Sequence, residues 1–395
     1  MILISKTMKM ILIVTLSVFV VALVCLGVSL AVEMLDGGNS YVAGGGGSVG
    51  GGGGASTQAA SVSSGIGEKT GIVLPCATKE GTYLGVSNER TQDISGDTAI
   101  KSGAAVLVDI TDNVTVAGKN ADTKIYPASM TKVMTLLVAC ENGKNPNELL
   151  TLTGEMVNKY NKVKGNDTQG PSLELVWQEG YQVTVEDAMY MVIYGSDTYA
   201  CWLLADYISG SEEKFVELMN SKAVELGLTG TNYTNCTGLF DVNHYTTCRE
   251  MAAVMAAAMN NETAKTILTS ISEYHIDVYV DGAKDEDASA NMWSNWYAGR
   301  TQKYPYVSPE GKEATIYVGK GSNVKFIGGK TGYETVPKAS FVTVGEDDTT
   351  KRLYVCVQVT RLDDTTRKEL TLAQAVEEST METRYIYYTY AKEPE

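Results

Sequence analysis

A glycine-rich stretch divides this chain into parts of very different folding capacity. Residues 37–65 read GGNSYVAGGGGSVGGGGGASTQAASVSSG, and so few apolar side chains cannot build a hydrophobic core. We expect a flexible linker here and place it at residues 34–70. The folded part then comprises residues 71–395, enough for one domain with a large insertion.

An uncharged apolar run precedes this linker. Residues 10–32 read MILIVTLSVFVVALVCLGVSLAV and follow Lys6 and Lys9. The run is long enough to cross a bilayer as a helix, and basic residues before it predict that the rest of the chain is exported. We interpret residues 1–33 as an N-terminal membrane anchor, with a cleaved secretory signal peptide as the alternative.

Composition excludes several classes of function. The formal net charge of −15 argues against nucleic acid as a partner, because nucleic acid requires a basic surface. The chain has only two histidines, His244 and His275, and neither lies near a Gly-x-Ser-x-Gly turn. Its seven cysteines show no Cys-x-x-Cys spacing, so we expect no metal site and no cofactor. A catalytic base in this chain is therefore expected to be a residue other than histidine.

The apolar pattern predicts strands at both ends of the folded part and helices between them. Such an order favours an α+β domain in which a terminal sheet carries a helical insertion. The predicted strands are 103–109, 114–117, 339–344 and 353–359, and the predicted helices are 127–140, 183–208 with a break near Gly195, 212–226, 248–259 and 366–389.

Ser129 and Lys132 lie three positions apart at the start of the first predicted helix, in PASMTK. Residues i and i+3 share one face of a helix, so the lysine amine can reach the serine hydroxyl. A lysine serves as a base for a serine nucleophile once its environment favours the neutral amine. Taken alone, this spacing is equally compatible with a helix start that carries an exposed lysine.

Two further motifs follow in the sequence. Gly195-Ser196-Asp197-Thr198 separates two predicted helices, and Gly329-Lys330-Thr331-Gly332 follows the apolar residues Phe326 and Ile327 of a predicted strand. A Lys-Thr-Gly on an edge strand presents a cation, a hydroxyl and backbone groups to an extended peptide. The three motifs in this order indicate a site assembled from three elements.

This set of motifs resembles the D-alanyl-D-alanine carboxypeptidases, low-molecular-mass penicillin-binding proteins of the serine DD-peptidase class. The resemblance covers about residues 100–390 and implies an α/β sandwich of the DD-peptidase/β-lactamase type, with an antiparallel sheet flanked by helices and an all-helical subdomain. The matching stretches are AAVLVD at 104–109, PASMTKVMT at 127–135, VTVEDAMYMVIYGSDTYACWLLADYISG at 183–210, ELGLTGTNYTNCTGL at 225–239 and GGKTG at 328–332.

The resemblance also implies a role for each residue of the site. Ser129 is the acyl-forming nucleophile, Lys132 its proton acceptor, and Ser196 the serine that relays protons to the leaving amine. The substrate-binding residues implied are Thr198, Lys330, Thr331, Gly332, Tyr333 and Arg361, with the backbone N–H groups of Ser129 and Tyr333 as oxyanion hole. The implied partners are peptidoglycan stem peptides ending in D-Ala-D-Ala and β-lactams as covalent inhibitors, on the outer face of a bacterial cell membrane.

One residue departs from the family pattern, because Thr198 stands where the family has asparagine. A hydroxyl is shorter than a carboxamide and carries a single donor proton, so altered substrate preference or rate is expected. Three alternatives to the carboxypeptidase remain open: a DD-endopeptidase, a class A-like β-lactamase, and a non-catalytic module that binds cell wall or senses β-lactams. A β-lactamase requires a glutamate base, for which Glu225 is the candidate, although Glu225 is expected at a helix end.

Overall fold

The computed structural model describes residues 74–77, 83–86, 91–143, 145–163, 177–270, 273–293, 306–307, 313–314, 324–334, 338–360 and 372–391. The chain divides into the units Met1–Glu68 and Lys69–Glu395, and all described residues belong to the second. The predicted anchor and linker lie outside these ranges and stay predictions. Among the helices described, none combines the length and apolar character needed to span a bilayer.

A six-stranded sheet forms one part of the described structure, with the order β14-β15-β16-β4-β5-β3. Neighbouring strands are antiparallel except β3 and β5, which are parallel. Strands from the two ends of the folded part meet where β16 pairs with β4, as the sequence predicts for a terminal sheet. The strands are β3 (Gln92–Asp93), β4 (Ala104–Asp109), β5 (Val114–Lys119), β14 (Val324–Glu334), β15 (Lys338–Asp347) and β16 (Leu353–Val359).

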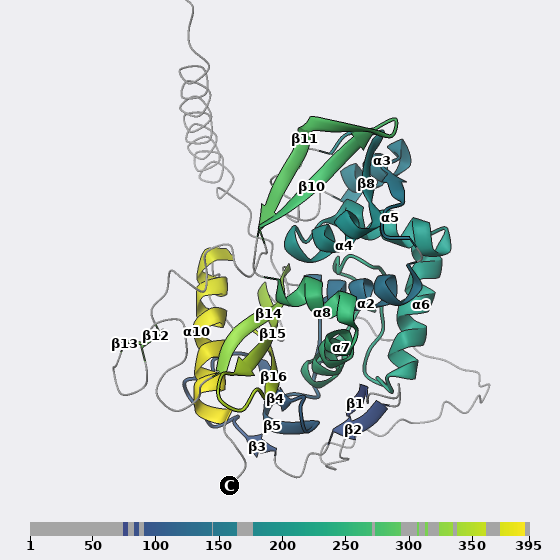
Figure 1. The fold of residues 1–395 in the computed structure, drawn as a ribbon. Coiled ribbons are helices and arrows are strands. Elements are labelled where there is room, and N and C mark those ends of the chain that lie inside the picture. Colours follow the sequence, from purple (N-terminus) through teal and green to yellow (C-terminus); the bar gives the residue numbers. More distant parts are fainter. Residues whose placement is uncertain are drawn as a thin grey trace, which may run out of the picture. The chain divides into compact units, whose positions relative to one another are not determined.

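Both faces of this sheet are buried, because alternate side chains of each central strand enter different cores. In β4, Leu107 packs with Ile386 and Tyr387 of α10 (Leu372–Tyr390), whereas Val106 faces the opposite core. The second core consists of helices that contact the other face of the sheet, among them α7 (Cys248–Asn260). Figure 1 shows α10 and α7 on either side of the sheet strands. The arrangement confirms the α+β fold class.

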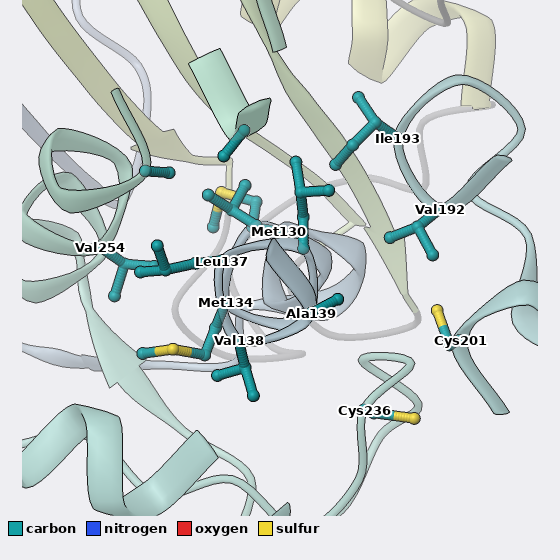
Figure 2. Packing of buried hydrophobic residues seen from close by; sticks show 14 of the residues in the cluster. Met130, Met134, Leu137, Val138, Ala139, Val192, Ile193, Cys201, Cys236 and Val254 are labelled. Atoms are coloured by element: carbon teal, nitrogen blue, oxygen red, sulfur yellow. The ribbon is translucent and has the colours of Figure 1, made fainter. Parts of the chain in front are cut away.

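Helix α2 (Lys132–Asn142) is the centre of the helical core. It follows a 3-10 turn, η1 (Ala128–Thr131), so the predicted helix at 127–140 consists of two consecutive elements. Every residue from Lys132 to Ala139 is buried, including the polar residues Lys132 and Thr135. Figure 2 shows why: Leu137 points towards Val254 of α7, whereas Val138 and Ala139 point to other neighbours.

The other predicted helices form close to their expected positions. Side-chain caps set their starts: the Thr184 side chain accepts from Asp187 N–H in a capping box, and Asp197 and Ser211 cap the next two helices. These helices are α4 (Val185–Tyr194), α5 (Thr198–Ser209) and α6 (Glu212–Glu225). Two further helices, α3 (Gly154–Val163) and α8 (Glu262–Thr269), were not predicted. The break between α4 and α5 falls at Gly195, as predicted.

A second, four-stranded antiparallel sheet accompanies these helices, so the helical part is not purely helical. Its order is β11-β10-β8-β7, with β7 (Leu149–Thr151), β8 (Tyr181–Thr184), β10 (Glu273–Val280) and β11 (Ala283–Trp293). Asp281 and Gly282 both have positive φ and close the β10–β11 hairpin, a turn that Asp-Gly favours. The sequence predicts a rim loop or small β-element at residues 278–324, rich in tryptophan and tyrosine, and this hairpin covers the first part of that segment.

Short strand pairs complete the described elements: β1 (Leu74–Ala77) with β2 (Tyr83–Val86), β6 (Lys124–Ile125) with β9 (Thr246–Thr247), and β12 (Tyr306–Val307) with β13 (Glu313–Ala314). Five cysteines whose side chains the structure describes are free thiols, and all but Cys140 are buried: Cys140, Cys201, Cys236, Cys248 and Cys356.

Candidate active site

Ser129 and Lys132 are brought together by the junction of η1 and α2. Both are buried, with 3% of Ser129 and none of Lys132 exposed. Lys132 Nζ donates to Ser129 Oγ at 3.0 Å and to the Thr237 carbonyl oxygen at 2.5 Å. The interpretation of Lys132 as an exposed helix lysine is therefore wrong, because Lys132 is buried and its Nζ has a serine hydroxyl and a backbone carbonyl as partners.

The residue that precedes Ser129 in sequence, Ala128, has an unusual backbone conformation. Ala128 has φ +49, a left-handed conformation that a residue with a Cβ seldom adopts. Gly238 packs against it so closely that a Cβ at position 238 would lie 2.0 Å from the Ala128 carbonyl oxygen. Asn235 shapes this neighbouring loop, since its Oδ1 accepts from the N–H groups of Thr237 at 3.1 Å and Gly238 at 2.8 Å. The loop thus fixes both Ala128 and the carbonyl that holds Lys132.

Ser196 contributes the second hydroxyl of the site from the loop between α4 and α5. It has φ +52, and its Oγ accepts a hydrogen bond from Lys330 Nζ at 3.1 Å. Lys330 is only 2% exposed and also donates to the Thr331 carbonyl at 2.8 Å. The Ser196 loop and the Lys-Thr-Gly strand, which are far apart in sequence, therefore meet through a buried lysine.

Asp197 fixes the Ser196 loop. Its Oδ1 accepts from the N–H of Ala200 at 2.9 Å, which caps α5, and its Oδ2 accepts from Trp177 Nε1 at 2.9 Å. Thr198, predicted to bind substrate, is the first residue of α5 and only 2% exposed. The structure therefore places Thr198 beside Ser196, as buried as Lys330 and Ser129.

Strand β14 presents its outer edge next to Ser129. Thr360 N–H donates to the Ala339 carbonyl at 2.9 Å, so the backbone groups of Ala339 face β16. Because Tyr333 pairs with Ala339, the N–H and C=O of Tyr333 point away from β15, towards the outer edge. A Cβ on Gly332 would lie 3.1 Å from the Pro127 carbonyl and 2.4 Å from Ser340 Oγ. Glycine therefore allows this edge to approach the residues that precede the nucleophile.

His244 supports the turn between Ser129 and Lys132. Thr234 N–H donates to His244 Nδ1 at 3.1 Å, so the ring proton resides on Nε2, which donates to Thr131 Oγ1 at 2.8 Å. Burial lowers the pKa of His244 to about 4, opposed by the charge of Asp241 and assisted by that of Lys132. His244 is thus a neutral packing residue, and it touches the turn through Thr131.

Acidification is expected to destabilise the fold through His244. Its pKa is lowered in the folded protein, so the unfolded chain binds this proton first as the pH falls. The contribution is unaffected above pH ~6.5 and declines towards pH ~4, with a loss of about 2 kcal/mol between pH ~7.5 and ~5. Urea unfolding of the native protein and His244→Gln at both pH values measures it. An identical pH dependence in the two proteins would contradict this account.

Two residues named from the sequence, Arg361 and Glu225, are not part of the site as the structure describes it. Arg361 lies outside the described residues, so its role stays a prediction. Glu225 ends α6 at the surface, where its carboxylate lies 2.9 Å from Lys222 Nζ. In the part of the chain that the structure describes, no cluster of three or more His, Cys, Asp or Glu side chains offers a metal site.

The sequence did not indicate three of these contacts: the Thr237 carbonyl, the Asp197–Trp177 hydrogen bond and the His244–Thr131 hydrogen bond. A backbone acceptor has no side-chain signature. The one available signal was Asn235 ahead of Thr237 and Gly238, a spacing typical of a side chain that stabilises its own turn.

Solved structures define the class of fold. The crystal structure of the Streptomyces K15 DD-transpeptidase matches with a TM-score of 0.56 at 20% identity, covering 73% of this chain and 97% of that chain. Penicillin-binding protein 5 from Haemophilus influenzae matches with a TM-score of 0.51 at 22% identity, covering 71% of this chain and 70% of that one. The described structure therefore has the DD-peptidase fold.

The family described as D-alanyl-D-alanine carboxypeptidase matches residues 89–296, more than half of the chain. The chain belongs to this family. The matched residues include Ser129, Lys132 and Ser196 but end before Lys330. The contact between Lys330 and Ser196 is thus an observation independent of that match.

Curated relatives agree with this assignment. The Bacillus subtilis carboxypeptidase DacF is 30% identical over 183 residues, covering 46% of this chain and 44% of the relative. The Escherichia coli carboxypeptidase DacC is 36% identical over 164 residues, covering 41% of this chain and 40% of the relative. The Streptomyces K15 carboxypeptidase is 26% identical over 292 residues, covering 71% and 93% respectively. The chain thus spans less than half the length of the first two relatives.

Proposed function

We propose that this protein is a serine-type D-Ala-D-Ala carboxypeptidase that removes the terminal D-alanine from peptidoglycan stem peptides. The observation that carries the proposal is the buried pair of Lys132 Nζ and Ser129 Oγ, 3.0 Å apart at the start of α2. A buried amine at this distance from a hydroxyl fits a nucleophile with its base. Membership of the carboxypeptidase family supports the same chemistry.

In the proposed acylation step, Ser129 Oγ attacks the carbonyl carbon of the penultimate D-alanine. Its proton passes to the neutral amine of Lys132, whose remaining N–H continues to donate to the Thr237 carbonyl. The backbone N–H groups of Ser129 and Tyr333 stabilise the oxyanion. The C–N bond then breaks, and Ser196 relays a proton to the departing D-alanine amine. Water hydrolyses the ester with Lys132 again as the base, which restores Ser129.

Recognition of the substrate is proposed to use β14. An extended peptide beside this strand can hydrogen-bond to the outward backbone groups of Tyr333, as in β-strand addition. Lys330 supplies the charge that attracts the terminal carboxylate, and the Thr331 hydroxyl donates to it. With the scissile carbonyl at Ser129 and the carboxylate near Lys330, the peptide runs antiparallel to β14.

Thr198 bears on the rate and the substrate preference of the enzyme. It begins α5 directly after Ser196 and Asp197, and at this side of the site Ser196 Oγ is in contact with Lys330 Nζ. Glu225 is a poor candidate for a catalytic base, since it pairs with Lys222 on the surface of α6. This pairing disfavours a class A-like β-lactamase, in which a glutamate activates the deacylating water.

The proposed setting is the outer face of a bacterial membrane. The apolar run at residues 10–32 and the linker at 34–70 would tether the catalytic domain there, or the domain is secreted if the run is cleaved. β-Lactams are expected to acylate Ser129 as covalent inhibitors. The acidic net charge of −15 accords with a partner other than nucleic acid.

Release of D-alanine from a stem pentapeptide ending in D-Ala-D-Ala tests the proposal. The wild-type protein is expected to release D-alanine, and Ser129→Ala to release none. Hydrolysis of cross-linked dimers without D-alanine release would indicate a DD-endopeptidase, and rapid hydrolysis of penicillin a β-lactamase. Acylation by penicillin without turnover of any peptide would indicate the sensing module and overturn the proposal.

A further inference from the structure

Two large apolar side chains are exposed in the loop that follows Gly238. Phe240 is 53% exposed and Val242 is 59% exposed. Removing such side chains from water is favourable, so apolar groups exposed beside a functional site can contribute to ligand binding. Whether these two do so depends on where the loop lies relative to the nucleophile.

The loop is adjacent to the nucleophile. A Cβ on Gly238 would lie 2.9 Å from the Ser129 backbone nitrogen, so Phe240 is only two residues from a contact with the catalytic turn. The Phe240 ring packs edge-to-face on Tyr126, with centroids 5.0 Å apart and an angle of 63° between the rings. Tyr126 itself is three residues before Ser129 and partly exposed. The aromatic pair therefore borders the site.

A cation completes this surface. Lys124 is exposed, and its Nζ lies 3.9 Å from the centroid of the Tyr245 ring and 5.9 Å from that of Tyr126. It also donates to the Val242 carbonyl at 3.3 Å. These partners are neutral, so the positive charge stays available to an anionic group of a ligand.

The direction of the bound peptide indicates what reaches this surface. The terminal carboxylate lies towards Lys330, so the residues ahead of D-Ala-D-Ala extend in the opposite direction, past Tyr333. Gly332 and Gly238 both approach the Ala128–Ser129 turn, since an added Cβ would lie 3.2 Å from Ala128 Cβ in the first case and 2.0 Å from the Ala128 carbonyl oxygen in the second. A peptide that passes this turn therefore meets the loop 238–242 and Tyr126.

We propose that Tyr126 and Phe240, with Lys124 beside them, form a subsite for the stem-peptide residues that precede D-Ala-D-Ala. The two rings pack on the aliphatic side chain of the residue before the D-alanines, and Lys124 attracts the carboxylate of the acidic residue before that. The subsite rests on the proposed carboxypeptidase function and adds to it a preference for a long, acidic stem over a minimal dipeptide end.

The test compares three peptides in steady-state kinetics. They are the pentapeptide L-Ala-γ-D-Glu-L-Lys-D-Ala-D-Ala, the same peptide with the free α-carboxylate of D-glutamate converted to an amide, and acetyl-Gly-D-Ala-D-Ala. In Phe240→Ser, the ratio of kcat/KM for the pentapeptide to that for the short peptide is expected to fall about tenfold. In Lys124→Gln, the preference for the acidic pentapeptide over its amide is expected to fall about threefold.

Val224→Ser is the matched control, because Val224 is 77% exposed on α6 and belongs to no site. It is expected to leave both ratios at their wild-type values. Tyr126→Ser repeats the test from the other side of the ring pair. Unchanged ratios in Phe240→Ser and Tyr126→Ser, with the wild type active on all peptides, would overturn the subsite alone. A wild type that turns over none of the peptides would instead overturn the proposed function, and the subsite with it.

Discussion

Lys132→Met is expected to lower the rate at which benzylpenicillin acylates Ser129 about 10³-fold. Lys132 Nζ lies 3.0 Å from Ser129 Oγ and is the amine placed to receive the hydroxyl proton. Methionine has a similar length and fills the same buried space, but it cannot accept a proton. The second-order rate constant of labelling by a fluorescent penicillin measures the loss.

The control separates catalysis from folding. Lys214→Met removes an exposed lysine on α6 and is expected to leave the acylation rate unchanged. In Lys132→Met the Thr237 carbonyl loses a hydrogen-bond donor, which costs about 1–3 kcal/mol of stability and shows in thermal unfolding. A folded Lys132→Met protein that is labelled at the wild-type rate would show that another group takes the proton.

Lys330→Met is expected to abolish the preference for a free C-terminal carboxylate. For the wild type, kcat/KM for a peptide ending in D-Ala-D-Ala should exceed that for its C-terminal amide about 10²-fold, because a charged hydrogen bond is lost with the amide. In Lys330→Met the two values should become similar. The physical reason is that Lys330, 2% exposed and bonded to Ser196, is the cation of the strand that lies beside the nucleophile.

Lys325→Met provides the comparison on the same strand. Lys325 Nζ pairs with Asp348 at 2.6 Å, at the other end of β14 from Tyr333, and its loss should leave the preference intact. Ser196→Ala removes the hydroxyl that contacts Lys330 while it keeps the charge, so this variant should be slower but still prefer the carboxylate. Equal preference in Lys330→Met and the wild type would contradict the assignment of Lys330.

The local elements of this fold could be predicted from sequence because their periodicity reflects burial. The strand Ala104–Asp109 and the two helices on either side of Gly195 formed as expected. A rim loop or small β-element was expected at residues 278–324, but its pairing was not, because β11 is rich in charged residues and the contact of β10 with β8 joins residues far apart in sequence. The one local signal of the β10–β11 hairpin was Asp281 followed by Gly282.

In the candidate site, too, contacts between residues near in sequence could be predicted more easily than contacts between distant residues. Helical spacing makes the contact between Ser129 and Lys132 possible, since residues i and i+3 share one face, and the two further motifs favour it over an exposed lysine. The contact between Lys330 and Ser196 joins residues 134 positions apart, so it could be expected only through resemblance to a family. The Thr237 carbonyl could not be expected at all, because any residue type supplies a carbonyl.

The effect of Thr198 is a matter of local geometry that the motif alone did not reveal. An asparagine at this position was expected to face the substrate, whereas the threonine of this chain begins α5 and is 2% exposed. The side chain before it, Asp197, satisfies both carboxylate oxygens with Ala200 and Trp177. The conformation of this loop is therefore held by the hydrogen bonds of Asp197 as well as by the contact of Ser196 with Lys330.

Mass spectrometry of the benzylpenicillin adduct tests the central claim most directly. After incubation with the antibiotic, the intact wild-type protein should gain the mass of one penicillin, and peptide mapping should place the adduct on Ser129. Ser129→Ala should gain no mass while it unfolds at the same temperature as the wild type. An adduct on a different residue, or none on the folded wild-type protein, would contradict the assignment of Ser129 as the nucleophile.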